Sequence, residues 1–67
     1  MTLENAIDKF LHGGVQWFTE YGAYVDSDYD LIFSKQSYYD AGFDNGYYEP
    51  AFKKWLFANA TLRKKGV

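Results

Sequence analysis

The sequence has no cysteine, one histidine and one proline among its 67 residues. Without cysteine the fold cannot rely on disulfides, and His12 alone cannot supply the ligands of a structural zinc site. No segment approaches the roughly 18 or more apolar residues of a membrane-spanning helix, and the N-terminus lacks the basic and apolar regions of a signal peptide. These absences favour a cytoplasmic protein that forms a single small domain over residues 1–67 and is stabilised by burying large side chains.

The residue combinations that catalysis requires are also missing. There is no cysteine nucleophile, and the imidazole of His12 lies at the end of a predicted helix, where a capping role accounts for it. The serines have no base at motif spacing, and the carboxylates lie in a stretch too polar for raised pKa values to be expected. We therefore expect no enzymatic activity, no catalytic residue and no cofactor.

Three aspartates in "DSDYDL", residues 26–31, match the first three ligand positions of an EF-hand calcium loop. Such a loop also needs glycine at its sixth position and a bidentate glutamate at its twelfth. Leu31 and Ser37 occupy those positions, so the tight turn and the strongest ligand are both missing. We interpret residues 26–30 as a solvated acidic turn and expect no metal site.

Aromatic residues are abundant, with 2 Trp, 7 Tyr and 6 Phe. Each aromatic side chain can bury roughly 150–250 Å², so a chain of this length cannot enclose all of them. Many are concentrated in "SYYDAGFDNGYYEPAF", residues 37–52, where acidic residues lie between them. Clustered aromatic side chains on a surface usually mark a contact with another molecule.

Charge is segregated along the chain, although the net charge is only −2. Residues 20–49 carry seven acidic residues and one basic residue, whereas residues 50–67 carry five basic residues and no acidic one. This segregation predicts either two surfaces of opposite sign or one segment folded onto the other.

Residues 3–12 are predicted to form an amphipathic helix. Thr2 can cap its N-terminus, and Gly13 with Gly14 can end it, because glycine adopts the left-handed conformation without steric cost. The apolar residues follow the helical spacing of i, i+3, i+4, i+7 and i+8. They are Leu3, Ala6, Ile7, Phe10 and Leu11.

Residues 50–65 are predicted to form a second helix. Pro50 suits a first helical position, and Gly66 follows the basic residues that suit a helix C-terminus. The apolar residues share one face, except Phe57, which points to the opposite side near Lys53 and Lys64. The shared face consists of Ala51, Phe52, Trp55, Leu56, Ala58 and Leu62.

The intervening segment leaves alternatives open. Residues 15–25 fit either a helix or an alternating strand, and their β-branched and aromatic residues favour the extended form. Residues 31–35 suit either the second arm of a hairpin or the start of a helix. Residues 35–49 suit a helix or irregular turn, which we favour, or a hairpin with Asn45-Gly46 as its type I′ turn.

The expected fold is therefore mainly α, with the two helices 3–12 and 50–65 and a third helix or short β-hairpin between them. The alternative is an α+β fold. The expected core is Leu3, Ile7, Phe10, Leu11, Phe18, Ile32, Phe52, Trp55, Leu56 and Leu62.

The acidic and aromatic middle of the chain suggests a function in protein binding. Regularly placed acids can present negative charge to a basic groove, and tyrosines add flat contacts that can form hydrogen bonds. We predict a small non-enzymatic module that inhibits or modulates a larger basic partner, including one that handles nucleic acid. In style it resembles phage host-takeover and anti-CRISPR proteins, which work in the cytoplasm of a host cell. The predicted face is Asp26, Asp28, Tyr29, Asp30, Tyr38, Tyr39, Asp40, Asp44, Tyr47 and Tyr48.

Two alternative functions remain open. The basic end of the second predicted helix could bind nucleic acid or a ribosome through Lys53, Phe57, Lys64 and Lys65, with lysines on phosphates and the ring on a base. The protein could instead be a homo-oligomer or a structural subunit of a larger assembly that buries its surplus aromatic side chains at subunit contacts. We expect no membrane partner.

Overall fold

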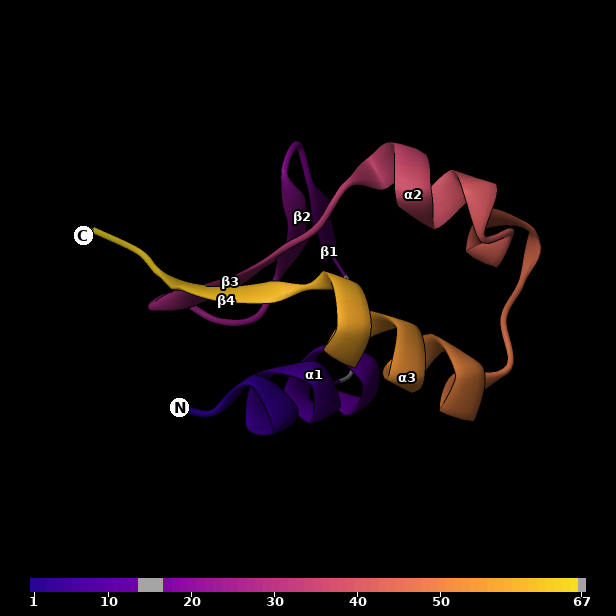
Figure 1. Ribbon diagram of the computed structural model, residues 1–67. Coiled ribbons are helices and arrows are strands. Elements are labelled where there is room, and N and C mark those ends of the chain that lie inside the picture. The colour runs from indigo at the N-terminus through magenta and orange to yellow at the C-terminus, as the bar shows by residue number, and fades with distance from the viewer. Residues whose placement is uncertain (14–16, 67) are drawn as a thin grey trace.

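The computed structural model describes residues 1–13 and 17–66 and has an α+β fold (Figure 1). The prediction of a mainly α fold is therefore wrong, because four short strands pair into one antiparallel sheet in the order β1-β2-β3-β4. The strands are β1 (Trp17–Thr19), β2 (Gly22–Tyr24), β3 (Tyr29–Ile32) and β4 (Thr61–Lys64). The helices are α1 (Leu3–His12), α2 (Lys35–Asp40) and α3 (Glu49–Asn59), with a 3₁₀ turn, η1 (Phe43–Asn45).

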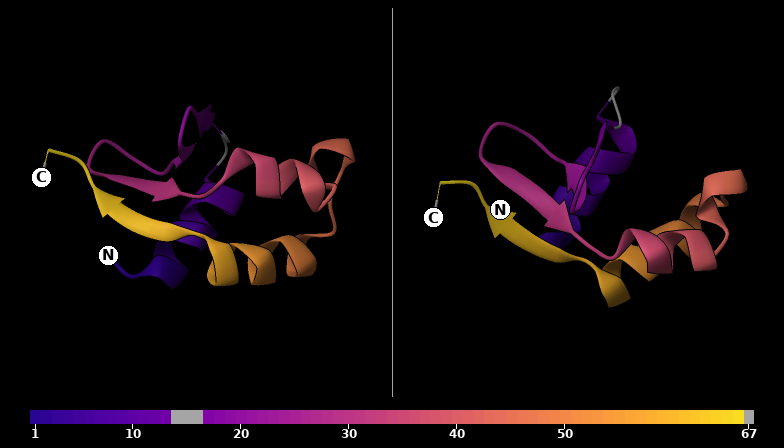
Figure 2. Two further views of the ribbon diagram at one scale, coloured as in Figure 1. Left: turned by 45° about the horizontal axis from the view of Figure 1, so that its top comes forward. Right: turned by 90° about the horizontal axis from the view of Figure 1, so that it is seen from above.

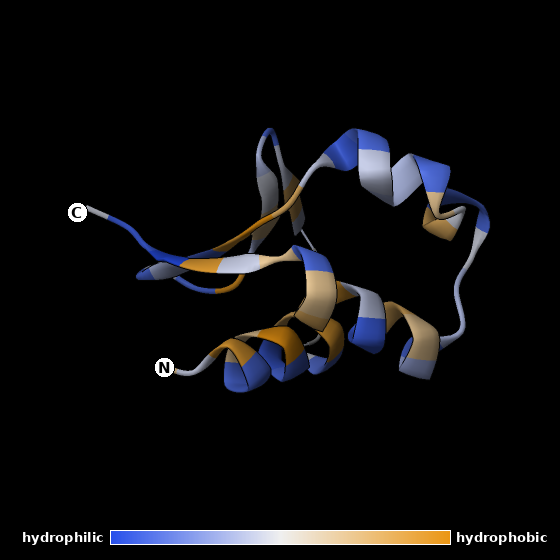
Figure 3. Ribbon diagram, viewed as in Figure 1, coloured by the Kyte–Doolittle hydropathy of each residue, from blue (hydrophilic) through white to orange (hydrophobic). Residues whose placement is uncertain are grey.

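Helix α1 has the predicted bounds. The Thr2 side chain accepts a hydrogen bond from the Asn5 amide at 3.1 Å, which satisfies one of the free donors at the helix start. Gly13 is the C-cap residue, while Gly14, the other half of the predicted stop, lies outside the described residues. Figure 3 shows α1 with its hydrophobic side turned toward the sheet.

The second predicted helix is wrong beyond residue 59. Helix α3 ends at Asn59, whose side-chain amide donates to the Trp55 carbonyl at 2.9 Å, and residues 61–64 form a strand instead. Strand β4 pairs with β3, with Leu62 opposite Leu31. This pairing gives the backbone N–H and C=O groups of residues 61–64 hydrogen-bond partners in a neighbouring strand. The resulting stabilisation outweighs the helical spacing of the apolar residues in this segment.

The chain between α1 and α3 contains both a hairpin and a helix. The extended form favoured for residues 15–25 is confirmed for 17–19 and 22–24, which form the β1–β2 hairpin; residues 15 and 16 lie outside the described residues. The Asn45-Gly46 hairpin is not formed, because residues 43–45 form η1 and Gly46 follows as its cap. Strand β3 takes Tyr29 and Asp30 from the predicted acidic turn, leaving a bend at 26–28.

The sheet has one face toward the helices, called here the inner face. Its central row crosses all four strands and consists of Phe18, Ala23, Leu31 and Leu62. All three α-helices pack on this side, since rings of α1, α2 and α3 contact Phe18 or Phe33. Figure 2 shows β3 and β4 in front when the molecule is seen from above, with α1 behind the sheet.

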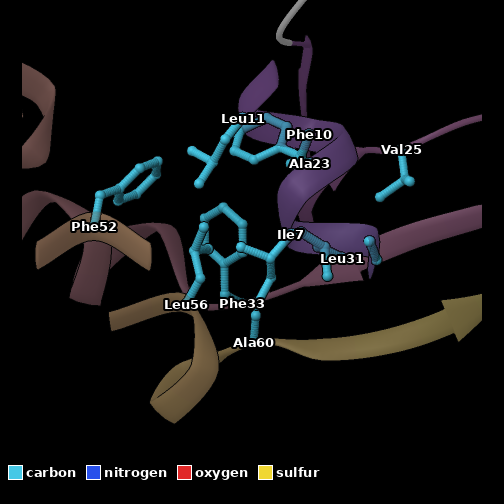
Figure 4. Close-up of a cluster of buried hydrophobic side chains, with 11 residues drawn as sticks. Ile7, Phe10, Leu11, Ala23, Val25, Leu31, Phe33, Phe52, Leu56 and Ala60 are labelled. Carbon is cyan, nitrogen blue, oxygen red and sulfur yellow. The ribbon is translucent and has the colours of Figure 1, made fainter. Parts of the chain in front are cut away.

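The core lies between α1, α3 and the inner face (Figure 4). Of the predicted core residues, five are buried, namely Ile7, Phe10, Leu11, Phe52 and Leu56. Leu3, Trp55 and Leu62 are partly buried against them. Phe18 is 43% exposed on the inner face. Ile32 is half-buried on the other face of the sheet, because Leu31 and Phe33 point inward in the observed register. The residues that the sequence missed are Ala6, Ala23, Val25, Leu31, Phe33 and Ala60.

Among the described residues, no helix is both long and apolar enough to cross a membrane.

Candidate functional site

Tyr38 is the centre of an aromatic cluster at the end of the molecule that α2 and η1 form. Its ring lies 5.3 Å from the Phe18 ring and 5.8 Å from the Phe52 ring, measured between centroids. Its hydroxyl donates to the Phe43 carbonyl at 3.3 Å. Burial, followed by the charge of Asp44, raises the pKa of Tyr38 above its usual value. Further rings packed against it belong to Phe33, Tyr39, Phe43 and Trp55.

This cluster explains much of the aromatic excess. Phe43 packs on Phe52 with ring centroids 4.8 Å apart, and Tyr47 packs on Phe52 at 4.7 Å. The rings therefore hold the short α2 and η1 segments, which contain no fully buried residue, against α3. Side chains that the sequence alone assigned to a partner are thus partly used for internal packing.

A pocket of about 270 Å³ opens beside this cluster. Ser34 caps α2 by accepting a hydrogen bond from the Ser37 amide at 3.2 Å, and Gly42, with φ of +84°, allows the chain to turn into η1. These two local features bring residues of α2 and η1 together with β1. The pocket is lined by Phe18, Lys35, Tyr38, Tyr39 and Asp44.

Exposed acidic and aromatic side chains lie at the same end of the molecule as the pocket. We call them the α2–η1 surface, which consists of Tyr39, Asp40, Asp44, Tyr47 and Tyr48. Tyr48 is 74% exposed and Tyr39 is 51% exposed. The Gln36 amide donates to Asp40 at 2.9 Å. Neither Asp40 nor Asp44 forms an ion pair with the described part of the chain.

The other predicted acidic residues lie at the opposite end of the molecule, around the β2–β3 connection (Figure 1). Asp26 accepts hydrogen bonds from the Asp28 and Tyr29 amides at 2.8 and 2.9 Å, which shapes the turn. It also pairs with Lys9 at 2.9 Å, and this hydrogen bond is the main reason why the pKa of Asp26 is lowered. Asp28 is exposed, whereas Tyr29 is partly buried against the core.

Asp30 is used within the fold. It is only 4% exposed and pairs with Arg63 at 2.9 Å and with Lys65 at 3.4 Å. The acidic middle and the basic end of the chain therefore meet at this point, as one reading of the charge segregation anticipated. The ten residues of the predicted acidic and aromatic face consequently do not form one surface.

The predicted basic face is also divided. Lys53 pairs with Asp8 of α1 at 2.8 Å, and that hydrogen bond is the main reason why the pKa of Lys53 is raised. Lys64 and Lys65 belong to β4 and the residue after it, not to a helix. Phe57 is 43% exposed on α3. The structure places Lys53 on the α1 side and Lys65 on the other side of the sheet.

Metal ligands are not assembled in the described structure. Asp26 forms an ion pair with Lys9, whereas Asp30 forms one with Arg63. Within residues 1–13 and 17–66, no group of three or more His, Cys, Asp or Glu side chains could hold a metal ion.

Sequence reasoning missed two residues of the pocket, Phe18 and Lys35. Phe18 is in the expected core, and its alternation with Trp17 and Thr19 is the signal for a strand with two unlike faces. Comparison with protein-family models, with curated proteins and with solved structures gives no match.

Proposed function

We propose that this protein is a small non-enzymatic binding module that inhibits or modulates a larger protein with a basic surface, in the cytoplasm of its cell. The observation that carries the proposal is the pocket between Phe18, Tyr38 and Asp44, which opens among the exposed residues of the α2–η1 surface. The partner would contact this end of the molecule, and not the predicted ten-residue face.

The size of the pocket supports a protein partner. Sites for drug-sized ligands usually measure about 300–1,000 Å³, and this pocket of about 270 Å³ suits one large side chain. Exposed tyrosines around such a pocket supply broad contact area with few rotatable bonds, a pattern typical of interface centres.

The charge around the pocket supports a basic partner. Residues 34–49 carry Asp40, Asp44 and Glu49 against the single basic residue Lys35. An arginine or lysine from the partner could lay its stem on the Tyr39 ring and bring its cation to Asp44, combining cation–π attraction with an ion pair. Acidic side chains also accelerate association with a basic surface at low ionic strength.

The proposal is tested by affinity capture from cell lysate at low and high salt, followed by binding measurements with the purified partner. The test variant is Tyr39→Ala with Asp44→Asn. The matched control is Tyr21→Ala with Glu20→Gln, which removes an exposed tyrosine and an exposed acid from the β1–β2 turn. We expect the test variant to bind at least about tenfold more weakly, since interface-centre side chains commonly contribute 2 kcal/mol or more, with the control unchanged. Equal affinities for the two variants would contradict the proposal.

A further inference from the structure

The sheet has a second face, called here the outer face, that carries a row of four side chains quite unlike the apolar inner row. The strand register places Trp17 opposite Tyr24, Tyr24 opposite Asp30, and Asp30 opposite Arg63. One residue of each strand thus lies next to its neighbour in an unbroken row. Because strands are about 4.8 Å apart, the row extends over roughly 14 Å.

The outer row is exposed at its two ends, whereas Asp30 in the middle is buried. Trp17 is 62% exposed and the Arg63 side chain is 52% exposed. The ring contacts of α1, α2 and α3 with the sheet all involve inner-face residues, and in the view from above no helix lies in front of β3 and β4 (Figure 2). The Trp17 ring lies at the end of the row on the edge strand β1, so much of it is accessible for stacking.

Two cations are held over this row by one buried acid. The Arg63 guanidinium is 2.9 Å from one oxygen of Asp30, and the Lys65 ammonium is 3.4 Å from the other. That second oxygen forms no hydrogen bond within the described structure. The Lys65 ammonium also lies 4.5 Å from the centroid of the Tyr24 ring. Asp30 therefore positions two basic groups, one of them over the Tyr24 ring, and the row together with Lys65 carries one positive charge more than negative.

We infer that the outer face binds single-stranded nucleic acid. One base stacks on the Trp17 ring, and Arg63 and Lys65 bind neighbouring phosphates. Stacking on an aromatic ring together with a positively charged track is the usual chemistry of single-strand recognition, and it requires base faces that a duplex does not expose. This inference is independent of the proposed function, because it uses other residues on another surface.

The inference is tested with a fluorescently labelled oligothymidylate of about 12 nucleotides, which exceeds the smallest single-strand site sizes. Binding is measured by anisotropy at low salt for the wild type, for Trp17→Ala and for the control Phe57→Ala, which removes an exposed ring from α3. We expect Trp17→Ala to weaken binding roughly 5- to 150-fold, the range for loss of one stacked base, and Phe57→Ala to have no effect. Circular dichroism checks that both variants remain folded.

The charge contribution is tested by the salt dependence of binding. Lys65→Gln leaves the pair of Arg63 with Asp30 intact and should reduce the slope of log K against log salt by about 0.7, the value for one phosphate contact with a single strand. Lys54→Gln, on an exposed α3 residue, should leave the slope unchanged. No binding by the wild type at low salt would overturn the inference. So would equal affinities of wild type and Trp17→Ala, or equal affinity for a duplex of the same length.

Discussion

Gly22 controls how closely β2 approaches β3, and its replacement by alanine should be strongly destabilising. Its φ of +152° is rarely adopted by other residues. A Cβ atom at this position would lie 2.1 Å from the Leu31 carbonyl oxygen and 3.0 Å from the Ile32 Cα atom. Both atoms belong to the backbone of β3, so they cannot move aside without disturbing the centre of the sheet.

The expected cost follows from two contributions. An unfavourable backbone conformation costs about 1–3 kcal/mol, and overpacking against rigid neighbours costs about 1–3 kcal/mol more. We therefore expect Gly22→Ala to lower the free energy of unfolding by about 2–6 kcal/mol. For a domain of this size this would lower Tm by at least roughly 8 °C.

The matched control is Gly42→Ala. Gly42 also has a positive φ, of +84°, but apart from Gly42 and its two chain neighbours no heavy atom of the described chain lies within 4 Å of the position of its added Cβ. The control therefore carries the conformational cost alone, about 1–2 kcal/mol. Urea unfolding followed by circular dichroism measures both variants. If Gly22→Ala is no more destabilising than Gly42→Ala, the argument from close strand approach is refuted.

Three further predictions concern charged and aromatic side chains. Arg63→Ala should lower the free energy of unfolding, measured in urea, by about 2 kcal/mol, because the substitution leaves the buried Asp30 with Lys65 as its single basic partner in the described structure. The cost is smaller than for a fully buried pair because Arg63 is half exposed, and a cost below about 0.5 kcal/mol would refute this prediction. The pKa of Asp26 is lowered in the folded state, so Asp26 should stabilise the protein at pH values above its unfolded-state pKa of 3.8 and lose this contribution as the pH falls through its folded-state pKa. In Asp26→Asn the free energy of unfolding should therefore decrease less steeply below about pH 4 than in the wild type. Tyr38→Ala should lower the free energy of unfolding by about 3 kcal/mol and Tyr38→Phe by less than about 1 kcal/mol, because packing of the ring contributes more than the 3.3 Å hydrogen bond of the hydroxyl. Similar costs for the two variants in thermal unfolding would contradict this order.

Local signals explain which elements could be predicted from the sequence. The bounds of α1 follow from the Thr2 cap, one apolar stripe and Gly13, all of which act within a few residues. The beginning of α3 follows from Glu49-Pro50 in the same way. The strands have only three or four residues, which is too short for alternation to be distinguished from helical spacing.

Long-range pairing explains what could not be predicted. Residues 61–64 continue the helical pattern of α3, but they form a strand because they can pair with β3. The two strands are far apart in sequence, with 33 positions between Asp30 and its partner Arg63. The same pairing sets the phase of β3, so that Leu31 points inward and Ile32 does not. A shift of one residue exchanges the two faces of a strand, and only the partner strand fixes that choice.

The candidate site, too, could be predicted from the sequence only in part. Of the side chains that the sequence assigned to a contact surface, Tyr38, Tyr39 and Asp44 line the pocket. The sequence could not show that Asp30 is taken up by Arg63 and Lys65, or that Tyr38 is a packing centre. Which groups remain accessible depends on tertiary contacts that no local pattern encodes.

The Asp30–Arg63 pair also has a consequence for protein synthesis. The carboxylate that is buried in the finished sheet is made 33 residues before its guanidinium partner. At about 5–20 residues per second, a ribosome takes roughly 2–7 s to add that length of chain. During this interval β3 has no β4 beside it, so the nascent chain presents an open strand edge and an uncompensated acid. The sheet can close only after residues 61–65 have been made, so its assembly follows translation of this last segment.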